Sequence, residues 1–173
     1  MGWSAPAGEQ DGLRQRYLAH LARRPDGWSR TCPGEHLTAS SLVCATDSRQ
    51  VLLTHHARLG RWLQTGGHLE PADVDLAGAA AREAAEESGL AGLNTDPDPL
   101  LLSAHALPPT VPCAAGGPMT HLDVQHLVLA GTAAPPVVSA ESTAVRWFEL
   151  NRLPEVDASV RALVAAAGRR LGW

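Results

Sequence analysis

Residues 75–88 are the stretch of the sequence that most constrains the fold, because their composition strongly favours a helix. Alanine dominates the run, and Gly89 stands where a left-handed C-terminal cap usually falls. Asp73 and Asp75 are both candidate N-caps, since a carboxylate can accept the free amide hydrogens of the first turn. A stripe of small residues lets this helix approach a sheet closely. The opposite face is also small and apolar, so periodicity leaves open which face is buried.

The last turns of this predicted helix hold three acids, Glu83, Glu86 and Glu87. The position is unfavourable, because a helix C-terminus carries partial negative charge that costs each anion roughly 0.3–1 kcal/mol. Glu83 also lies one turn from both other acids, which adds roughly 0.2–0.5 kcal/mol of repulsion for each pair. A bound cation reverses both effects, and carboxylates are the ligands that Mg²⁺ prefers. Arg82 can orient Glu86 from one turn away. The alternative, an acidic turn that only faces solvent, stays open at this point.

The chain around this helix alternates between strand and helix patterns. Apolar runs predict strands at 36–46, 50–56, 99–107, 121–131 and 143–150, and helical spacing predicts helices at 12–24 and 156–170. Two segments rich in proline and small residues, 108–120 and 132–142, are expected to be loops. No repeat or linker divides the chain, so the sequence predicts a single mixed α/β domain in layers.

Composition excludes several classes of function. A net charge of −4 gives no support for a specific nucleic-acid partner or for an anionic membrane surface. The three cysteines, Cys32, Cys44 and Cys113, are far apart, which argues against a disulfide framework or a cysteine-rich zinc site. No apolar run reaches the roughly 18 residues of a membrane span, and the N-terminus lacks a secretory pattern. We therefore expect a soluble protein of the cytoplasm.

Residues 67–90, GHLEPADVDLAGAAAREAAEESGL, resemble the Nudix box, G-x5-E-x7-R-E-U-x-E-E-x-G-U, in which U is apolar. The end of the motif matches position by position, at Arg82, Glu83, Ala84, Glu86, Glu87, Gly89 and Leu90. The preceding RWLQTGGHLEP is similar to the usual approach to the box, with Trp62, the glycine pair and Glu70.

The sequence departs from the Nudix box near its first acidic position. Asp73 stands in place of the glutamate, and one extra residue, which we place at Val74, separates it from Arg82. Thr65 stands where many members have proline. These differences put the role of Asp73 and the shape of the loop in question, but they leave the Arg-Glu and Glu-Glu pairs intact.

The resemblance implies a Nudix-type α/β/α sandwich with a mixed β-sheet. The hydrolase domain is then expected at 35–170, after an N-terminal helical extension at 1–34. Nudix proteins typically cleave the diphosphate linkage of a nucleoside diphosphate joined to another group, with Mg²⁺ or Mn²⁺ as cofactor. By this analogy Glu83, Glu86 and Glu87 are metal ligands, and Arg82, Glu83 and Glu86 are catalytic.

Four further residues are candidates for the site. Glu141 stands in a region where some Nudix proteins place an additional metal-binding or basic glutamate, so it is a candidate catalytic residue. Gly66 and Gly67 are expected to allow the backbone close to a phosphate, and His68 adjoins that position. The other histidines are expected to have ordinary roles, because no pair has a zinc-like spacing.

Two alternatives to hydrolysis remain. One is a Nudix module that binds a nucleotide without turnover, and the other is isomerisation of a prenyl diphosphate, which is expected to need an active-site cysteine. Substrate choice is expected to depend on the loops 108–120 and 132–142. Many Nudix proteins are homodimers, so a homodimer is one assembly to test.

Overall fold

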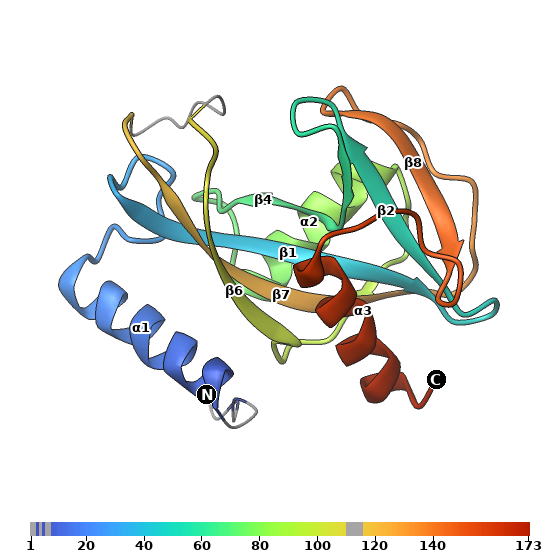
Figure 1. Ribbon diagram of the computed structural model, residues 1–173, viewed down its shortest axis with the longest axis horizontal. Coiled ribbons are helices and arrows are strands. Elements are labelled where there is room, and N and C mark those ends of the chain that lie inside the picture. The colour runs from blue at the N-terminus through green and yellow to red at the C-terminus, as the bar shows by residue number, and fades with distance from the viewer. Residues whose placement is uncertain (1–2, 4, 6–7, 110–115) are drawn as a thin grey trace.

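The two longest strands, β1 (Glu35–Ala45) and β7 (Thr120–Ala130), lie side by side in parallel in this computed structural model, which describes residues 3, 5, 8–109 and 116–173 (Figure 1). Both strands are buried along nearly their whole length. Such burial is typical of parallel strands with helices on both faces of the sheet.

The other edge of β1 has a different partner along each half. β4 (Thr65–His68) pairs antiparallel with residues 38–41, whereas β2 (Gln50–His56) pairs antiparallel with residues 43–45. β2 then continues away from β1 and pairs with β3 (Arg61–Leu63) and β8 (Ser142–Glu149). The sheet therefore splits where β2 and β4 diverge.

The outer edge of β7 pairs with two antiparallel strands, β5 (Asn94–Thr95) and β6 (Leu101–Ala106). Helix α1 (Glu9–Arg23) packs beside β6, and its Tyr17 hydroxyl donates a hydrogen bond to the Ser103 carbonyl at 2.8 Å. Tyr17 is buried with Leu37, Leu102 and Leu122. Apolar packing and a buried hydrogen bond therefore hold α1 on the sheet.

Helices α2 (Leu76–Ser88) and α3 (Ala158–Leu171) cover opposite faces of the sheet (Figure 1). α3 buries Leu163 against Leu42 and Leu53 of the strands. α2 places Ala80 against Ala39, and only small residues permit so close an approach. The predicted α/β/α sandwich with a mixed sheet is confirmed.

The ends of α2 are fixed by its own residues. The Asp75 carboxylate accepts a hydrogen bond from the Gly78 amide at 2.7 Å, so Asp75 and not Asp73 is the N-cap. Gly89 has a φ of 67°, the left-handed cap that the sequence predicts. The structure also decides which face of α2 is buried, since Ala80, Ala84 and Glu87 turn inward.

The predicted segments agree with the observed helices and strands to within a few residues. β3, β4 and β5 were not predicted, because strands of two to four residues are too short to show a periodic pattern. Val74 is exposed in the loop before α2, where the extra residue was expected. Residues 110–115 of the predicted loop 108–120, including Cys113, lie outside the described residues.

Candidate active site

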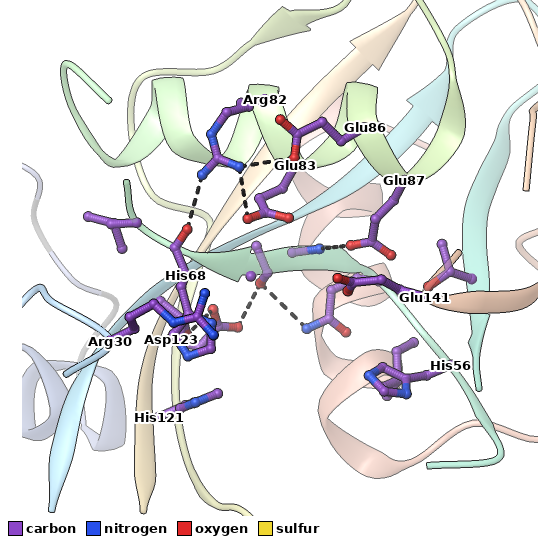
Figure 2. Close-up of a pocket in the computed structure, with 18 of the residues that line it drawn as sticks. Arg30, His56, His68, Arg82, Glu83, Glu86, Glu87, His121, Asp123 and Glu141 are labelled. Atoms are coloured by element: carbon purple, nitrogen blue, oxygen red, sulfur yellow. Dashed lines mark hydrogen bonds and ion pairs between the residues drawn. The ribbon is translucent and has the colours of Figure 1, made fainter. Parts of the chain in front are cut away.

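A cavity of about 820 Å³ opens where β2 diverges from β4 beside β1 (Figure 2). The C-terminal turns of α2 form one wall, and residues 66–68 of β4 form another. The remaining walls include polar side chains of β1 and β7 and the segment that ends at Glu141. The split in the sheet thus creates the space that the acidic end of α2 faces.

The glycine pair of β4 lets α2 bring its acids against the strand. The Gly66 amide donates a hydrogen bond of 2.7 Å to the Glu87 carboxylate. A Cβ atom on Gly67 would lie 2.6 Å from Oε1 of Glu83, and one on Gly66 would lie 2.3 Å from the Cβ of Ser40. A larger residue in place of Gly66 would force β4 away from β1, whereas one in place of Gly67 would displace the carboxylate of Glu83.

Burial and like charge act on these carboxylates together. The pKa of Glu87 is raised to about 7, mainly by burial and also by the charges of Glu83 and Glu141, against the hydrogen bond from Gly66. Burial is also the main cause of the raised pKa of Glu83, although Arg82 opposes the rise. Both groups are therefore held in a setting that disfavours their own negative charge.

The chemistry of these donors suits a hard divalent cation, and their role as its ligands stays a prediction. Glu83, Glu86 and Glu87 present carboxylate oxygens from adjacent turns of one rigid helix, and carboxylate oxygens are the ligands of Mg²⁺ and Mn²⁺. A cation among them would offset the unfavourable burial of Glu83 and Glu87. These three residues are those that would hold the metal.

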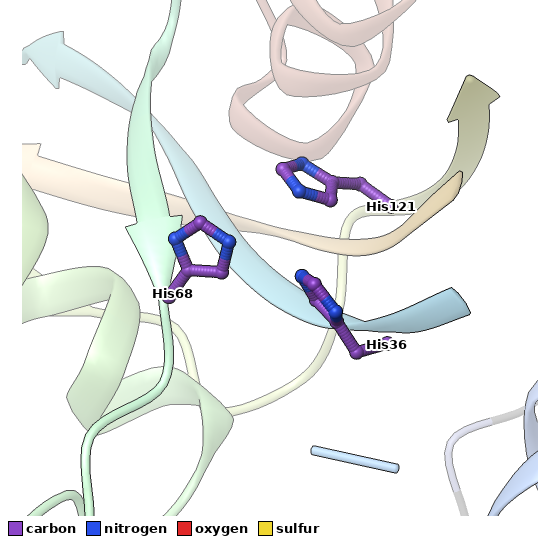
Figure 3. A group of neighbouring side chains, drawn as sticks. All are labelled: His36, His68 and His121. Carbon is purple, nitrogen blue, oxygen red and sulfur yellow. The ribbon is translucent and has the colours of Figure 1, made fainter. Parts of the chain in front are cut away.

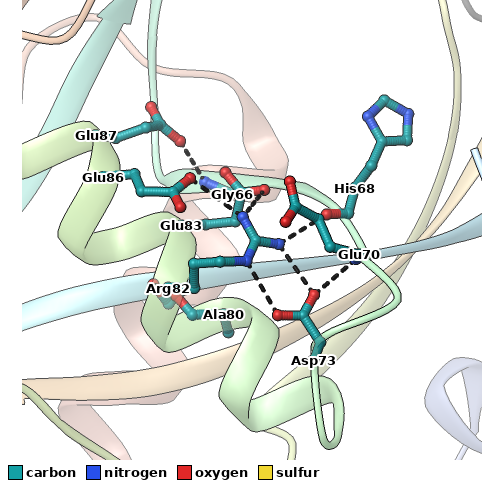
Figure 4. A network of polar contacts seen from close by, with 10 residues as sticks. Gly66, His68, Glu70, Asp73, Ala80, Arg82, Glu83, Glu86 and Glu87 are labelled. Atoms are coloured by element: carbon teal, nitrogen blue, oxygen red, sulfur yellow. Dashed lines mark hydrogen bonds and ion pairs between the residues drawn. The ribbon is translucent and has the colours of Figure 1, made fainter.

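Arg82 joins α2 to the loop that precedes it (Figure 4). Its guanidinium donates two hydrogen bonds of 3.0 Å to the Asp73 carboxylate and a third of 3.0 Å to the His68 carbonyl. It also donates to Glu83 at 3.0 Å and to Glu86 at 3.1 Å. Arg82 is thus a positioning residue for the acids.

Asp73 fixes the loop before α2 and does not reach toward the cavity. Its carboxylate accepts from the Glu70 amide at 2.7 Å as well as from Arg82, and its pKa is lowered mainly by the hydrogen bonds from Arg82. The loop therefore absorbs the extra residue while Arg82 keeps an acidic partner.

Glu141 lies across the cavity from α2 and comes from the segment before β8 (Figure 2). Glu83, Glu87 and Glu141 all line the cavity, and after burial the charge of Glu141 contributes to the raised pKa of the other two. The structure therefore brings Glu141 together with the acids of the predicted helix, although more than 50 residues separate them in sequence.

The floor of the cavity contains residues that the sequence did not single out for the site. Asp123 is buried and accepts hydrogen bonds from Thr38 at 2.9 Å, from Ser40 at 2.6 Å and from Gln125 at 3.2 Å. The available signal was the polar residue at every second position of two otherwise apolar strands, which places these side chains on one face.

His68 lines the cavity, and its backbone carbonyl contacts Arg82. Its carbonyl accepts from Arg82, whereas its ring packs against the rings of His36 and His121, with centroids 5.1 and 5.0 Å away. The ring does not point toward the acids, so a phosphate contact by this side chain stays a prediction.

Trp62 packs edge-to-face on Phe148, while Trp28 lines the cavity.

Several solved structures share this fold. The Caenorhabditis elegans Ap4A hydrolase binary complex has a TM-score of 0.57 at 18% identity, over 79% of this chain and 97% of that one. The NUDIX domain of Shewanella oneidensis NrtR with ADP ribose has a TM-score of 0.56 at 18% identity, over 88% and 97%. The Escherichia coli dihydroneopterin triphosphate pyrophosphohydrolase has a TM-score of 0.55 at 16% identity, over 74% and 91%. At these identities the likeness defines the fold alone.

The sequence itself identifies the family. The model of the NUDIX domain matches residues 34–167, which is most of the chain, and this protein belongs to the Nudix family. No curated protein matched the chain in a sequence search.

Proposed function

We propose that this protein is a divalent-metal-dependent pyrophosphohydrolase that cleaves the diphosphate linkage of a nucleoside diphosphate joined to another group, such as a nucleotide or a sugar. The observation that carries the proposal is the meeting of Glu83, Glu87 and Glu141 at one cavity, where burial and then their mutual charges raise the pKa of Glu83 and Glu87. Such an acidic cavity suits a cation and then the phosphates that the cation attracts.

Each residue of the site has a distinct part in this proposal. Glu83, Glu86 and Glu87 hold the cation, and Arg82 orients the first two through its hydrogen bonds. Gly66 and Gly67 allow a phosphate close to the backbone. Glu141 faces the same space and is the candidate base that accepts a proton from the attacking water. When bound, Mg²⁺ or Mn²⁺ would neutralise the diphosphate oxygens and acidify water.

The substrate class is supported by the proteins that share the fold. They include a hydrolase of Ap4A, a domain in complex with ADP ribose and a pyrophosphohydrolase of dihydroneopterin triphosphate. A cavity of this size, with charged and polar side chains among those that line it, can accommodate such a phosphate chain together with the groups attached to it.

Hydrolysis tests the proposal directly. The purified protein is incubated with Mg²⁺ or Mn²⁺ and nucleoside triphosphates, dinucleoside polyphosphates, ADP-ribose, nucleotide sugars or prenyl diphosphates, and the products are identified. We expect cleavage of a diphosphate linkage that falls at least about 100-fold in Glu86→Gln. Cleavage that continues unchanged in Glu86→Gln, or without a divalent cation, would contradict the proposal.

Glu141→Gln is expected to lower kcat by about 100-fold or more and to leave KM nearly unchanged, because the carboxylate that accepts the proton is lost. Steady-state kinetics on the substrate found in the screen measures both constants. Glu155→Gln, an exposed glutamate outside the cavity, is the matched control. Turnover of Glu141→Gln close to that of Glu155→Gln would remove Glu141 from the catalytic role.

The two alternatives differ in their products. A module that only binds would retain a nucleotide tightly and release nothing under Mg²⁺ or Mn²⁺. Isomerisation would convert a prenyl diphosphate without releasing phosphate. Neither Cys32 nor Cys44, the cysteines that the structure describes, lines the cavity, which disfavours isomerisation.

Membrane association and oligomeric assembly are two separate questions. Among the described residues, no helix has the length and apolar character needed to cross a membrane. A homodimer stays a prediction that sedimentation would test.

A further inference from the structure

Three histidines converge at the end of the cavity that lies beyond Asp123. The rings of His36, His68 and His121 point toward one another, and their centroids are 5.0–5.1 Å apart (Figure 3). One ring nitrogen from each residue lies within 4.8 Å of the other two. His68 and His121 line the cavity, so the group adjoins the space that a ligand would occupy.

The sheet holds these side chains in place from three strands. His36 of β1 is the register partner of His121 of β7, and His68 of β4 pairs with Thr38, two residues along β1. Because alternate residues of a strand share a face, β1 and β7 present His36 and His121 on the face that carries Asp123. The group is therefore fixed by backbone pairing and does not depend on a loop.

Two of the three rings bring to the group a buried nitrogen atom that has no hydrogen-bond partner among the described residues. Nδ1 of His36 lies 3.2 Å from the Cys32 carbonyl, which can only accept, so Nδ1 donates and the bond orients this ring. Nε2 of His68 and Nε2 of His121 are buried, and the described residues supply neither with a hydrogen-bond partner. Leaving a buried polar atom unpaired costs about 1–3 kcal/mol, so a ligand is expected there.

The rings are also in the neutral form that binds metals. Burial, together with the neighbouring imidazoles, lowers the pKa of His68 to about 4 and that of His121 to about 3. Arg30 contributes to the lowered pKa of His68 and of His36. No proton therefore has to be displaced from these rings near neutral pH before a cation binds.

We propose that His36, His68 and His121 form a second metal site, which takes a transition-metal ion of the Zn²⁺ class and is separate from the site of the glutamates. Imidazole nitrogens prefer Zn²⁺ and similar transition-metal ions, whereas carboxylates prefer Mg²⁺ or Mn²⁺. One cavity therefore contains two sets of donor atoms that prefer different metal ions.

The geometry needs only a small adjustment to hold such an ion. Zn–N bonds of about 2.0–2.1 Å at tetrahedral angles place the nitrogens about 3.4 Å apart, so rotation of the rings must bring them closer by roughly 1 Å. Three protein ligands leave the fourth position for water or for an oxygen atom of a ligand in the cavity. The Cys32 carbonyl is then the outer partner that orients His36.

Metal binding can be measured without reference to hydrolysis. Protein without a histidine tag is freed of metal with a chelator and titrated with Zn²⁺ by calorimetry. The variant Glu83→Gln/Glu86→Gln/Glu87→Gln removes the carboxylate donors, and we expect it still to bind one equivalent of Zn²⁺. His121→Gln, and separately His36→Gln, should weaken that binding by at least about 10–100-fold. Co²⁺ in place of Zn²⁺ should give the visible absorption of a tetrahedral nitrogen site.

His126→Gln is the matched control, because His126 is a buried histidine of the same strand that faces the opposite side of the sheet. It should bind Zn²⁺ as the parent does, and circular dichroism checks the fold of every variant. The proposal is overturned if the triple glutamine variant binds no Zn²⁺, or if His121→Gln binds it as tightly as His126→Gln.

Discussion

Arg82→Ala is expected to lower the free energy of unfolding by about 3 kcal/mol and to reduce hydrolysis as well. The side chain of Asp73 is only 7% exposed, so removal of Arg82 leaves a nearly buried carboxylate without its counter-charge. The His68 carbonyl, Glu83 and Glu86 lose a donor at the same time. Chemical denaturation of the folded variant measures the first effect, and kcat/KM on the substrate measures the second.

Arg24→Ala is the matched control for this prediction. Arg24 also donates two hydrogen bonds to an aspartate, Asp26, but both side chains are exposed, so we expect little or no loss of stability. Arg82→Lys should recover only part of the lost stability, because an ammonium group cannot reach all the acceptors of the planar guanidinium. Equal losses in Arg82→Ala and Arg24→Ala would show that the contacts of Arg82 do not fix α2 to its loop.

Glu87→Gln is expected to stabilise the metal-free protein above pH 4.5, and the gain should grow as the pH rises. The folded protein holds the pKa of Glu87 at about 7, above the ordinary value of 4.5. Between these values the unfolded chain releases the proton while the folded protein keeps it, so the wild type loses stability as the pH rises. At about 1.4 kcal/mol for each pH unit, the loss reaches about 3 kcal/mol near pH 7.

The measurement compares urea unfolding of the wild type and Glu87→Gln between pH 4 and pH 8 in the presence of a chelator. Glutamine can still accept the hydrogen bond from Gly66, so the difference isolates the charge. Mg²⁺ should reduce the advantage of the variant, because a cation offsets the charge in the wild type alone. Glu155→Gln controls for the loss of one glutamate. If the difference in the free energy of unfolding between the wild type and Glu87→Gln does not change with pH, the prediction that burial raises the pKa of Glu87 is wrong.

Most of the secondary structure was predictable because its signals are local. The alanine run with Asp75 and Gly89 at its ends fixed α2 to within one residue, since caps and helix formers act over a few positions. The long apolar runs of β1 and β7 likewise indicated buried strands. The Arg82-Glu83 and Glu86-Glu87 pairs could be recognised in the sequence because all four residues belong to one helix.

The partners of single residues were less predictable. Asp73 and Asp75 looked alike as N-caps, and only the fold of the loop assigns one to the helix and the other to Arg82. Glu141 was a candidate from resemblance, and only the pairing of β8 with β2 brings its segment to the cavity. Both outcomes depend on contacts between residues that are distant in sequence.

The sequence by itself determined the helices, the long strands and the acidic end of α2, since these depend on neighbours within a turn or on alternation along one strand. Only the tertiary structure decided that β2 diverges from β4 along the edge of β1, and that the gap between these two strands becomes the cavity. It also decided that His36, His68 and His121 meet. No spacing in the sequence encodes that meeting, because strand register across three chain segments brings the rings together.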